Sequence, residues 1–353
     1  MALSVLTLTN FRNHTLLTLR PQAQFIALHG ANGAGKTNIL EAVSLLVPGR
    51  GLRRAALSEM ANSISNSGFT ISAELDGTII GTGVEAAQLD RRKVRINGAN
   101  ASINNLAEWL SAIWLTPSMD RLFVDGAGAR RRFLDRLVLA LEPGHARHAS
   151  RYEKAVQQRN RILATHAAPD PFWLDAIETQ MAESGNFIVE ARARMLAALD
   201  VQLAILPKDP FPVPDIVLAM EGPTNAQELR EIWRSSRRKD AGAGRTLTGP
   251  HRADLVVHNR ANGQAADRCS TGEQKALMLS LILAHAALVS AQRGAPPILL
   301  LDEVAAHLDP DRRAALFARL GETGAQVWMT GTEAALFDTI GPAAHLVAVP
   351  GVG

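Results

Sequence analysis

The chain has 353 residues, of which 47% are hydrophobic and 20% are charged, the composition of a globular protein with one large or two ordinary domains. Its formal net charge of +3 permits a nucleic-acid partner without requiring one. The single cysteine, Cys269, excludes an intramolecular disulfide and is typical of a reducing cytoplasm. No apolar run approaches the length of a membrane span and no signal-peptide pattern is present, so we expect a cytoplasmic protein without a membrane partner.

The N-terminal third has the pattern of an α/β core followed by an antiparallel β layer. Residues 2–8 and 24–29 read as strands, and residues 36–47 have helical periodicity. Asn97-Gly98 is a typical hairpin turn pair. Shorter strands are predicted at residues 68–75, 77–83 and 92–96.

Helices are predicted to dominate the middle of the chain, at residues 127–142, 145–166, 172–205 and 224–236. A proline-rich stretch at 207–214 interrupts them, and strands return at 297–301 and 325–330. A helical insertion therefore splits an α/β domain in the sequence. We predict a discontinuous head made of residues 1–112 and 245–353, and an inserted helical arm made of residues 113–244.

The stretch GANGAGKT at residues 30–37 lies between an apolar strand and a helix and satisfies the P-loop pattern G-x-x-x-x-G-K-[ST]. Glycines let backbone N–H groups approach phosphate oxygens, and the helix N-terminus favours anions. Lys36 is expected to reach the β- and γ-phosphates of ATP, and the Thr37 hydroxyl to bind Mg²⁺. The predicted phosphate cradle consists of Gly30, Ala31, Asn32, Gly33, Ala34, Gly35, Lys36 and Thr37.

The stretch PILLLDE at residues 297–303 is an apolar strand that ends in two carboxylates. Asp302 is predicted to hold Mg²⁺, directly or through water. Glu303 is predicted to act as the general base that polarises the attacking water, and Glu303 and Lys36 are therefore the predicted catalytic residues. Alone this pattern is weak, because apolar strands often end in acidic turns, but its pairing with the P-loop strengthens it.

The stretch STGEQK at residues 270–275 has two interpretations. In the first, Ser270 and Glu273 form a capping box at the start of an apolar helix. In the second, the Ser270 hydroxyl and the backbone of Thr271 and Gly272 form a second anion site. Since the P-loop encloses its own phosphates, the second site would bind the γ-phosphate held by another copy. Two copies would then form an ATP-dependent homodimer about a two-fold axis.

These motifs resemble the head of an ABC-type ATPase of the SMC class. STGEQK is similar to the ABC signature, AHLDPDRR places Asp309 in a D-loop near the dimer seam, and NFRNH places Arg12 and Asn13 near the nucleotide. Under this resemblance the nucleotide-binding residues outside the P-loop are Arg12, Asn13, Ser270, Gly272, Glu273 and Asp309.

Three further stretches, covering residues 129–137, 157–163 and 248–255, resemble the RecF family of bacterial recombination mediators. The resemblance extends over essentially the whole chain. It implies an ABC/SMC-type P-loop head with an antiparallel β layer and a short helical arm, a weak DNA-stimulated ATPase with ATP and Mg²⁺ as cofactors, and slow hydrolysis. It further implies binding to gapped DNA or single-strand/duplex junctions, RecR and RecO as partners, and a role in RecA loading and the SOS response.

The chain departs from the ABC pattern at two places. IWLTPSMD has no glutamine where a glutamine loop is expected, and Thr330, Gly331 and Thr332 occupy the region of the switch histidine. These departures argue against the main alternative, an ABC subunit of a membrane transporter. An SMC-like nuclease complex lacks a histidine/aspartate metal cluster to support it, and a P-loop kinase would leave the signature and D-loop unexplained.

Basic clusters on the predicted arm are candidates for contact with the phosphate backbone of DNA. The candidates are Arg130, Arg131, Arg151, Lys154 and Arg159. Another cluster comprises Arg234, Arg237, Arg238 and Lys239. A charge run is also commonly a solvated face, and with 5% aromatic residues neither base stacking nor sequence-specific reading is expected. The role of His251 and Arg252 is left open between structure and the nucleotide pocket.

Overall fold

The structure is a computed structural model, and it describes residues 1–62, 67–165, 170–207 and 209–350. The chain divides into two compact units. The first unit consists of Met1–Asp120, Pro207–Phe211 and Met278–Gly353, and the second consists of Arg121–Leu206 and Pro212–Leu277. Each unit is described separately below.

The first unit contains a parallel sheet with the strand order β13-β3-β12-β11-β8. Its strands are β3 (Phe25–His29), β8 (Ala112–Leu115), β11 (Ile298–Leu301), β12 (Val327–Gly331) and β13 (Ala344–Ala348). All residues of β8, β11 and β12 are buried, as expected for apolar strands of a parallel sheet that is covered on both faces, although β8 lies at the edge of the sheet. The P-loop follows β3 directly and leads into α1 (Lys36–Ser44).

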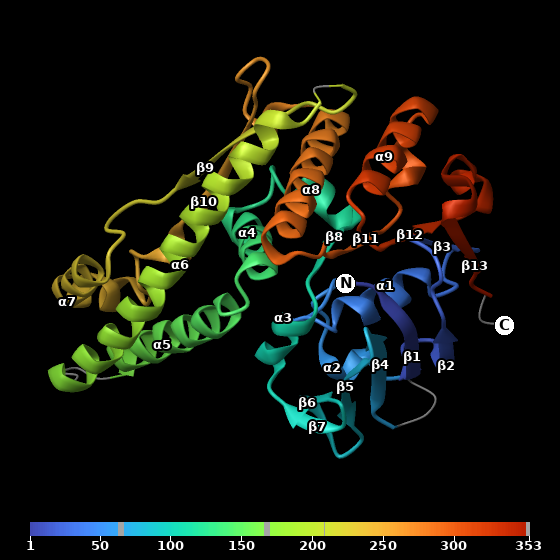
Figure 1. Cartoon of the computed structure of the whole chain (residues 1–353). Helices are drawn as coiled ribbons and strands as arrows, with labels where there is room; N and C mark the ends of the chain where they lie inside the picture. The colour runs from blue at the N-terminus through green and yellow to red at the C-terminus, as the bar shows by residue number, and fades with distance from the viewer. Residues whose placement is uncertain (63–66, 166–169, 208, 351–353) are drawn as a thin grey trace. The chain divides into compact units, whose positions relative to one another are not determined.

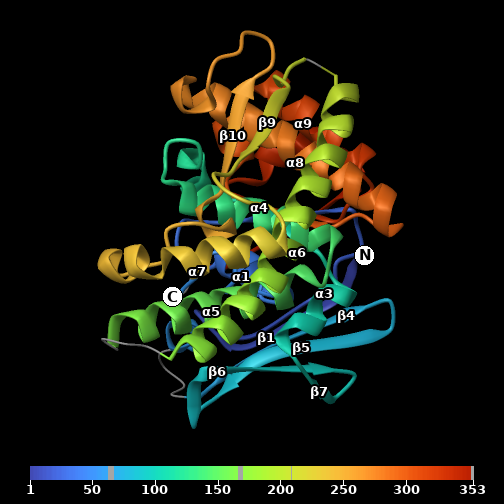
Figure 2. The same cartoon turned by 90° about the vertical axis from the view of Figure 1, so that its left-hand side faces the viewer.

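An antiparallel sheet in the same unit has the strand order β2-β1-β4-β5-β6-β7. Its strands are β1 (Leu3–Phe11), β2 (His14–Leu19), β4 (Phe69–Leu75), β5 (Thr78–Glu85), β6 (Gln88–Ile96) and β7 (Ala99–Ala101), and Figure 2 shows β4 to β7 following one another. Alternate residues of β4 are buried, which places one face of the sheet on the core. Asn97 and Gly98 join β6 to β7 with φ angles of 49° and 81°, so the predicted hairpin turn is confirmed.

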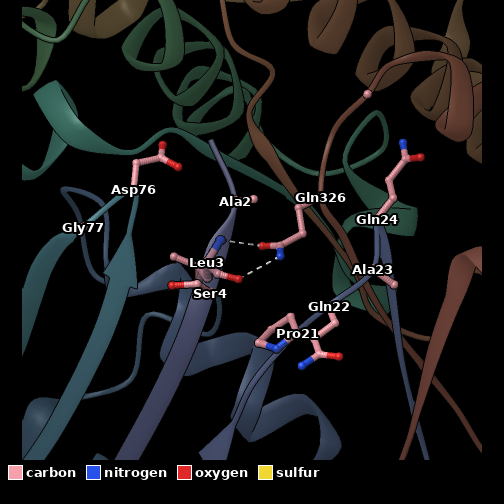
Figure 3. Close-up of a pocket in the computed structure, with 11 residues that line it drawn as sticks. Ala2, Leu3, Ser4, Pro21, Gln22, Ala23, Gln24, Asp76, Gly77 and Gln326 are labelled. Atoms are coloured by element: carbon pink, nitrogen blue, oxygen red, sulfur yellow. Dashed lines mark hydrogen bonds between the residues drawn. The ribbon is translucent and has the colours of Figure 1, made fainter.

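The side chain of Gln326 connects the start of the antiparallel sheet to the parallel sheet (Figure 3). Its Oε1 accepts a hydrogen bond from the backbone N–H of Leu3 at 2.9 Å, and its Nε2 donates to the Leu3 carbonyl at 3.0 Å. Trp328 Nε1 donates to the same Oε1 at 3.1 Å. Gln326 is 5% exposed, so these three bonds satisfy polar groups that have little access to water.

The helices of the first unit cover its sheets and connect them. They are α1, α2 (Leu57–Met60), α3 (Leu106–Trp109), α9 (Pro310–Glu322) and the greater part of α8 (Thr271–Arg293). One continuous hydrophobic cluster joins β1, β4, α1 and the parallel sheet. The P-loop therefore stands on a packed scaffold, which fixes the direction in which α1 leaves β3.

The second unit is built mainly from helices. They are α4 (Ala127–Leu141), α5 (His145–Thr165), α6 (Pro171–Ile205), α7 (Ala226–Ala243) and the first turns of α8. Figures 1 and 2 show α5 alongside α6, and their shared core includes Tyr152, Leu174 and Trp233. β10 (Asp254–Asn259) pairs with β9 (Pro214–Ala219), and this pairing places residues that we predict from the sequence as head in the second unit.

A buried ionic network holds α5, α6 and α7 together. The Arg159 side chain is fully buried and donates to Glu178 at 2.9 Å, to Asp240 at 2.7 Å, to Thr246 at 2.8 Å and to the Trp233 carbonyl at 2.8 Å. A buried guanidinium is tolerated only when its donors are satisfied in this way. Arg159 is therefore a structural residue of the helical unit.

Helix α8 is long and apolar enough to cross a membrane, with a mean hydropathy of 1.5 over an 18-residue window. This corrects the expectation that no apolar run approaches that length. Within the described structure 83% of the window is buried, however, as in the central helix of a folded core. The burial explains the hydropathy without a membrane.

Candidate functional site

Three neighbouring parallel strands end at the same edge of the sheet and bring the predicted site together. β12 lies between β3 and β11, with Thr330 paired to Leu28 and Met329 paired to Leu301. The loop 30–37 follows β3, and Asp302 follows β11. The carboxyl edge of a parallel sheet is the usual place for a ligand site in an α/β fold.

The P-loop backbone requires glycine at two positions in particular. Gly33 and Gly35 have φ angles of 83° and 101°, which side chains with a Cβ rarely adopt. A Cβ on Gly35 would also lie 2.5 Å from the Asn13 amide. Gly35 caps α1 without a side-chain hydrogen bond, which leaves the first N–H groups of this helix for an anion.

Lys36 is 5% exposed and its ammonium group is held against the loop. Nζ donates to the carbonyl oxygens of Gly30 at 2.7 Å and Ala31 at 2.8 Å. These bonds place a positive charge inside the concave loop, where phosphate oxygens would provide stronger, charged acceptors. The geometry agrees with the phosphate-binding role predicted for this lysine.

A chain of hydrogen bonds links the P-loop helix to the ends of β11 and β12. Asp302 Oδ1 accepts from Thr37 Oγ1 at 2.9 Å and from Thr330 Oγ1 at 2.8 Å. Thr330 Oγ1 in turn accepts from the backbone N–H of Glu303 at 2.9 Å. Thr330 therefore orients both acidic residues, a role that the sequence analysis missed although this residue ends an apolar strand at the same edge of the sheet.

The Glu303 side chain lines a small cavity beside the P-loop. The cavity has a volume of about 180 Å³ and is lined by Asn32, Gly33, Gly35, Lys36, Thr37, Asn38, Arg53 and Glu303. Glu303 has a φ angle of 55°, an uncommon backbone conformation for glutamate. A strained carboxylate residue beside a phosphate cradle is typical of a functional position.

Arg12 and Asn13 lie in the β1–β2 turn and support the P-loop and α1. Arg12 forms two 2.9 Å hydrogen bonds to Glu41 of α1, a fully buried carboxylate. Asn13 Nδ2 donates to the Ala34 carbonyl at 2.9 Å, and His14 Nε2 lies 3.2 Å from the Gly35 carbonyl. Asn13 is thus beside the loop, whereas Arg12 is bound to Glu41 of α1.

Arg53 and Asn38 are members of the site that the sequence analysis did not identify. Arg53 Nη1 donates to Asn38 Oδ1 at 2.6 Å and to Glu41 at 3.1 Å, and 40% of its side chain remains exposed. Arg53 belongs to no recognisable motif, which explains why it was missed. It adds a second cation to the cavity that contains Lys36.

The signature residues form a complete capping box at the start of α8. Ser270 N–H and Oγ donate to Glu273 Oε2 at 2.9 and 2.7 Å, and Glu273 N–H donates to Ser270 Oγ at 3.3 Å. The capping interpretation is therefore confirmed. Gly272 is exposed beside this cap. In the first unit, Asp309 caps α9 by accepting from Arg312 N–H at 2.9 Å.

The candidate DNA contacts on the helical unit differ in how far their side chains are buried and bonded within the protein. The prediction for Arg159 is wrong, because its guanidinium is fully buried in the network described above. Arg130 is 16% exposed and binds Asp254 at 2.8 Å, while Arg131 donates to the Ala253 carbonyl at 2.8 Å. Both have internal partners, as does Arg151, which is 47% exposed and lies 3.1 Å from Glu183.

Lys154 is exposed on α5 and remains a candidate contact for DNA. His251, whose role the sequence left open, is packed inside the helical unit. The Tyr152 hydroxyl lies 2.7 Å from His251 Nδ1, and His251 Nε2 lies 3.0 Å from the Thr246 carbonyl. Burial raises the pKa of Tyr152, so the phenol donates and the imidazole accepts. His251 is therefore structural.

The P-loop region fits one hard cation and no metal cluster of the protein's own. Among residues 1–62, 67–165, 170–207 and 209–350, no three His, Cys, Asp or Glu side chains lie close enough to hold a metal. Thr37 Oγ1 and Asp302 Oδ1 provide two oxygen ligands 2.9 Å apart. Mg²⁺ commonly takes one or two protein oxygens and completes its shell with water and substrate phosphates.

Comparison with known proteins agrees with this geometry. The family described as RecF/RecN/SMC N terminal domain matches residues 2–349. A solved Smc head domain from Pyrococcus furiosus has a TM-score of 0.56 at 16% identity over 99% of this chain and 94% of that chain. The solved structure of the recombination mediator protein RecF-ATPrS has a TM-score of 0.83 at 22% identity, over 99% and 96% of the two chains. The fold is that of the RecF and SMC class of ATPase heads.

Curated relatives of high identity show which family within the RecF and SMC class the chain belongs to. The DNA replication and repair protein RecF of Mesorhizobium japonicum is 49% identical, over 96% of this chain and 93% of that protein. The protein of the same name from Brucella suis is 48% identical, over 95% and 91% of the two chains. This chain belongs to the RecF family.

Proposed function

We propose that this protein is an ATP-binding DNA replication and repair protein that hydrolyses ATP slowly. The observation that best supports this proposal is that the P-loop, Asp302 and Glu303 lie together at one edge of the parallel sheet. The names of the curated relatives support the repair role, and two solved RecF structures bear nucleotide names, RecF-ATPrS and RecF-ATP.

In the proposed site the backbone of the loop and Lys36 bind the phosphates. Thr37 and Asp302 would hold Mg²⁺, and the bound ion would neutralise charge on the phosphate oxygens. Thr330 keeps the Asp302 carboxylate and the Glu303 backbone in place. Glu303 accepts a proton from the attacking water, since it is the carboxylate that lines the cavity with Lys36 and Thr37.

A second part of the proposal concerns the signature. Ser270 and Gly272 would bind the γ-phosphate held by a second copy, so that ATP stabilises a homodimer while ADP does not. Ser270 Oγ is exposed and already placed at the start of a helix, where the N-terminal dipole favours an anion. The capping box is compatible with this role, because Thr271 and Gly272 are exposed beside it.

The dimer is proposed to act as a clamp on gapped DNA or single-strand/duplex junctions in the cytoplasm. RecR and RecO are the proposed partners, because the RecF structures that this fold resembles belong to the RecFOR pathway. Help in loading RecA and a contribution to the SOS response follow from the same family membership. The exposed Lys154 and Arg151 are the candidate DNA contacts that remain.

Nucleotide and DNA binding by Lys36→Ala test this function. We expect the variant to lose binding of fluorescent ATP by at least about 100-fold, because a charge-assisted contact and the loop geometry are lost together. ATP-dependent DNA retention should disappear with it. Full ATP affinity in the variant would contradict the assigned site, and DNA binding that ignores ATP would contradict the coupling.

A further inference from the structure

Two aromatic side chains at the start of α6 are exposed to solvent. Phe172 is 83% exposed and Trp173 is 54% exposed. Single exposed apolar side chains are common, but two adjacent large rings are a costly apolar surface and often mark a binding site. They lie in the second unit, in the first turn of α6 (Pro171–Ile205).

The helix start that presents these rings is well fixed. Asp170 accepts a hydrogen bond from the Phe172 N–H at 2.9 Å, and Pro171 occupies the first turn. The next residue, Leu174, is 1% exposed and packs into the core shared by α5, α6 and α7. Because Leu174 faces the core, its two aromatic neighbours on the helix face away from it and are exposed.

A row of arginines on α7 lies beside this end of α6. Arg230, Arg234 and Arg238 are exposed and repeat every four residues, which places them on one helix face at intervals of roughly 6 Å. Arg234 Nε lies 3.8 Å from Asp175 Oδ1. Asp175 follows Phe172 by three residues, so it shares that side of α6.

Arg237 fixes the two helices together without using this row. Its guanidinium binds Asp175 and, at 2.5 Å, Glu178. The acidic residue of α7 that shares this face is Glu231, three positions before Arg234, and it accepts a hydrogen bond from Gln227 at 3.0 Å. Arg234, which is 69% exposed, therefore reaches the side of α6 that Phe172 shares with Asp175.

We propose that Phe172, Trp173 and the arginine row of α7 form a binding site for single-stranded DNA. Bases stack on the two rings, and the phosphates that follow along the strand meet Arg230, Arg234 and Arg238. Aromatic faces next to cations are the usual chemistry of sequence-independent single-strand binding. The inference rests on the proposed DNA function for the identity of the polymer, and it revises the expectation that base stacking plays no part.

A single strand fits this surface better than a duplex or a protein partner. In a duplex the base faces are stacked on one another, so exposed rings gain no base contact. A specific protein interface needs about 800 Å² per partner with a largely apolar centre. Here the residues that follow the two rings on α6 are small or polar, with Ala176, Thr179 and Gln180, and the facing residues of α7 include Arg230 and Arg234.

The test compares the affinity of the full chain for labelled oligothymidylate and for a blunt duplex of equal length. In Phe172→Ala/Trp173→Ala the single-strand affinity should fall by about tenfold or more, and duplex affinity by less than about twofold. Trp173→Phe should retain single-strand binding, because the ring is kept. Trp109→Ala is the matched control, since Trp109 is 37% exposed on α3 in the first unit.

Two further measurements, fluorescence quenching and the salt dependence of affinity, test the single-strand site independently of the double variant. Oligothymidylate should quench tryptophan emission in wild type and in Trp109→Ala, and quench it much less in Trp173→Phe. Arg230→Gln/Arg238→Gln should reduce the slope of log affinity against log salt for single strands by about 1.4.

Single-strand affinity that is unchanged in Phe172→Ala/Trp173→Ala overturns the inference, and so does an equal loss for single strands and duplex. A change in Trp173 emission that follows protein concentration without DNA would instead identify a protein-docking surface. If wild type binds duplex and single strands but the variants behave like wild type, only this inference fails. If wild type binds no DNA under any nucleotide condition, the proposed function fails with it.

Discussion

The interior of the head depends on one amide side chain that joins its two sheets. In Gln326→Leu, the backbone N–H and carbonyl of Leu3 and the Trp328 indole N–H lose their partner. We expect the free energy of unfolding to fall by about 2 to 4 kcal/mol, because buried polar groups are left unsatisfied. Urea denaturation followed by circular dichroism measures this change.

The matched control for this prediction is Gln22→Leu. Gln22 lines the same groove as Gln326 but is exposed, so its replacement should change stability by no more than about 0.5 kcal/mol. Equal effects of the two substitutions would show that the amide of Gln326 does not join the sheets.

Glu303 is the residue on which the proposed chemistry depends. In Glu303→Gln the loop, Lys36 and Thr37 are unchanged, so ATP binding should persist while the hydrolysis rate falls by about 100-fold or more. The variant should accumulate as an ATP-bound dimer in size-exclusion chromatography. A monomeric elution profile with ATP, or hydrolysis at the wild-type rate, would exclude Glu303 as the base. Glu322→Gln, at the exposed end of α9, is the control and should behave as wild type.

Residues that belong to a short motif could be predicted from the sequence, and residues that act through tertiary contact could not. The P-loop, Asp302 and Glu303 were identified because spacing and strand context define them. Thr330 was placed in the region of the switch histidine, but its hydrogen bond to Asp302 could not be predicted from that position. Arg53 reaches the site from the segment after α1 and belongs to no motif. The Arg159 prediction failed because charge alone does not distinguish a solvated cation from one whose donors are satisfied inside.

Among the elements, we expect the segment that contains His251 to make the stability of the helical unit depend on pH. Burial lowers the pKa of His251 below its usual 6.5, with the hydrogen bond to Thr246 opposing and the nearby Arg252 and Arg131 charges adding to the effect. The neutral imidazole is therefore the native form. Its contribution to stability is present above pH 6.5 and is lost as pH falls through the lower folded-state pKa.

We therefore expect the thermal midpoint of the wild type to fall between pH 7.5 and 5.5 more than that of His251→Gln. Glutamine can accept from Tyr152 and donate to Thr246 without titrating, at a cost of about 1 kcal/mol at neutral pH. Differential scanning fluorimetry across this range measures the difference. Parallel pH dependence of the two proteins would show that His251 does not carry it.

Most elements with a clear apolar pattern were predicted, and the helix α9 was not. The predicted helices correspond to α1, α4, α5, α6 and α7, and the predicted strands to β1, β3 to β6, β11 and β12. β8, β9 and β13 were not predicted; β8 and β13 have only four and five residues, and β9 begins at a proline. β2 was missed because it follows the β1 turn without a break signal.

For the whole molecule, the two compact units defined by contacts have different boundaries from the head and arm predicted from the motifs. The sequence places residues 245–277 in the head, whereas they pack in the second unit, since β9 and β10 pair only after the chain has folded back. Such pairing depends on partners about forty residues apart and leaves no local signal. The division into a head of residues 1–112 and 245–353 and an arm of residues 113–244 stays a prediction about function, because contacts alone do not show which residues act together.

The mass of the protein in solution, measured by light scattering, shows whether ATP joins two copies through the signature. We predict that the wild type is a dimer with Mg²⁺ and ATP and a monomer with ADP or without nucleotide. Ser270→Arg should bind ATP but stay monomeric, while Ser102→Arg, in the exposed capping box of Ser102 and Asn105, should still dimerise. A wild type that stays monomeric in ATP, or a Ser270→Arg variant that dimerises with ATP, would show that the signature does not bind the nucleotide of a second copy.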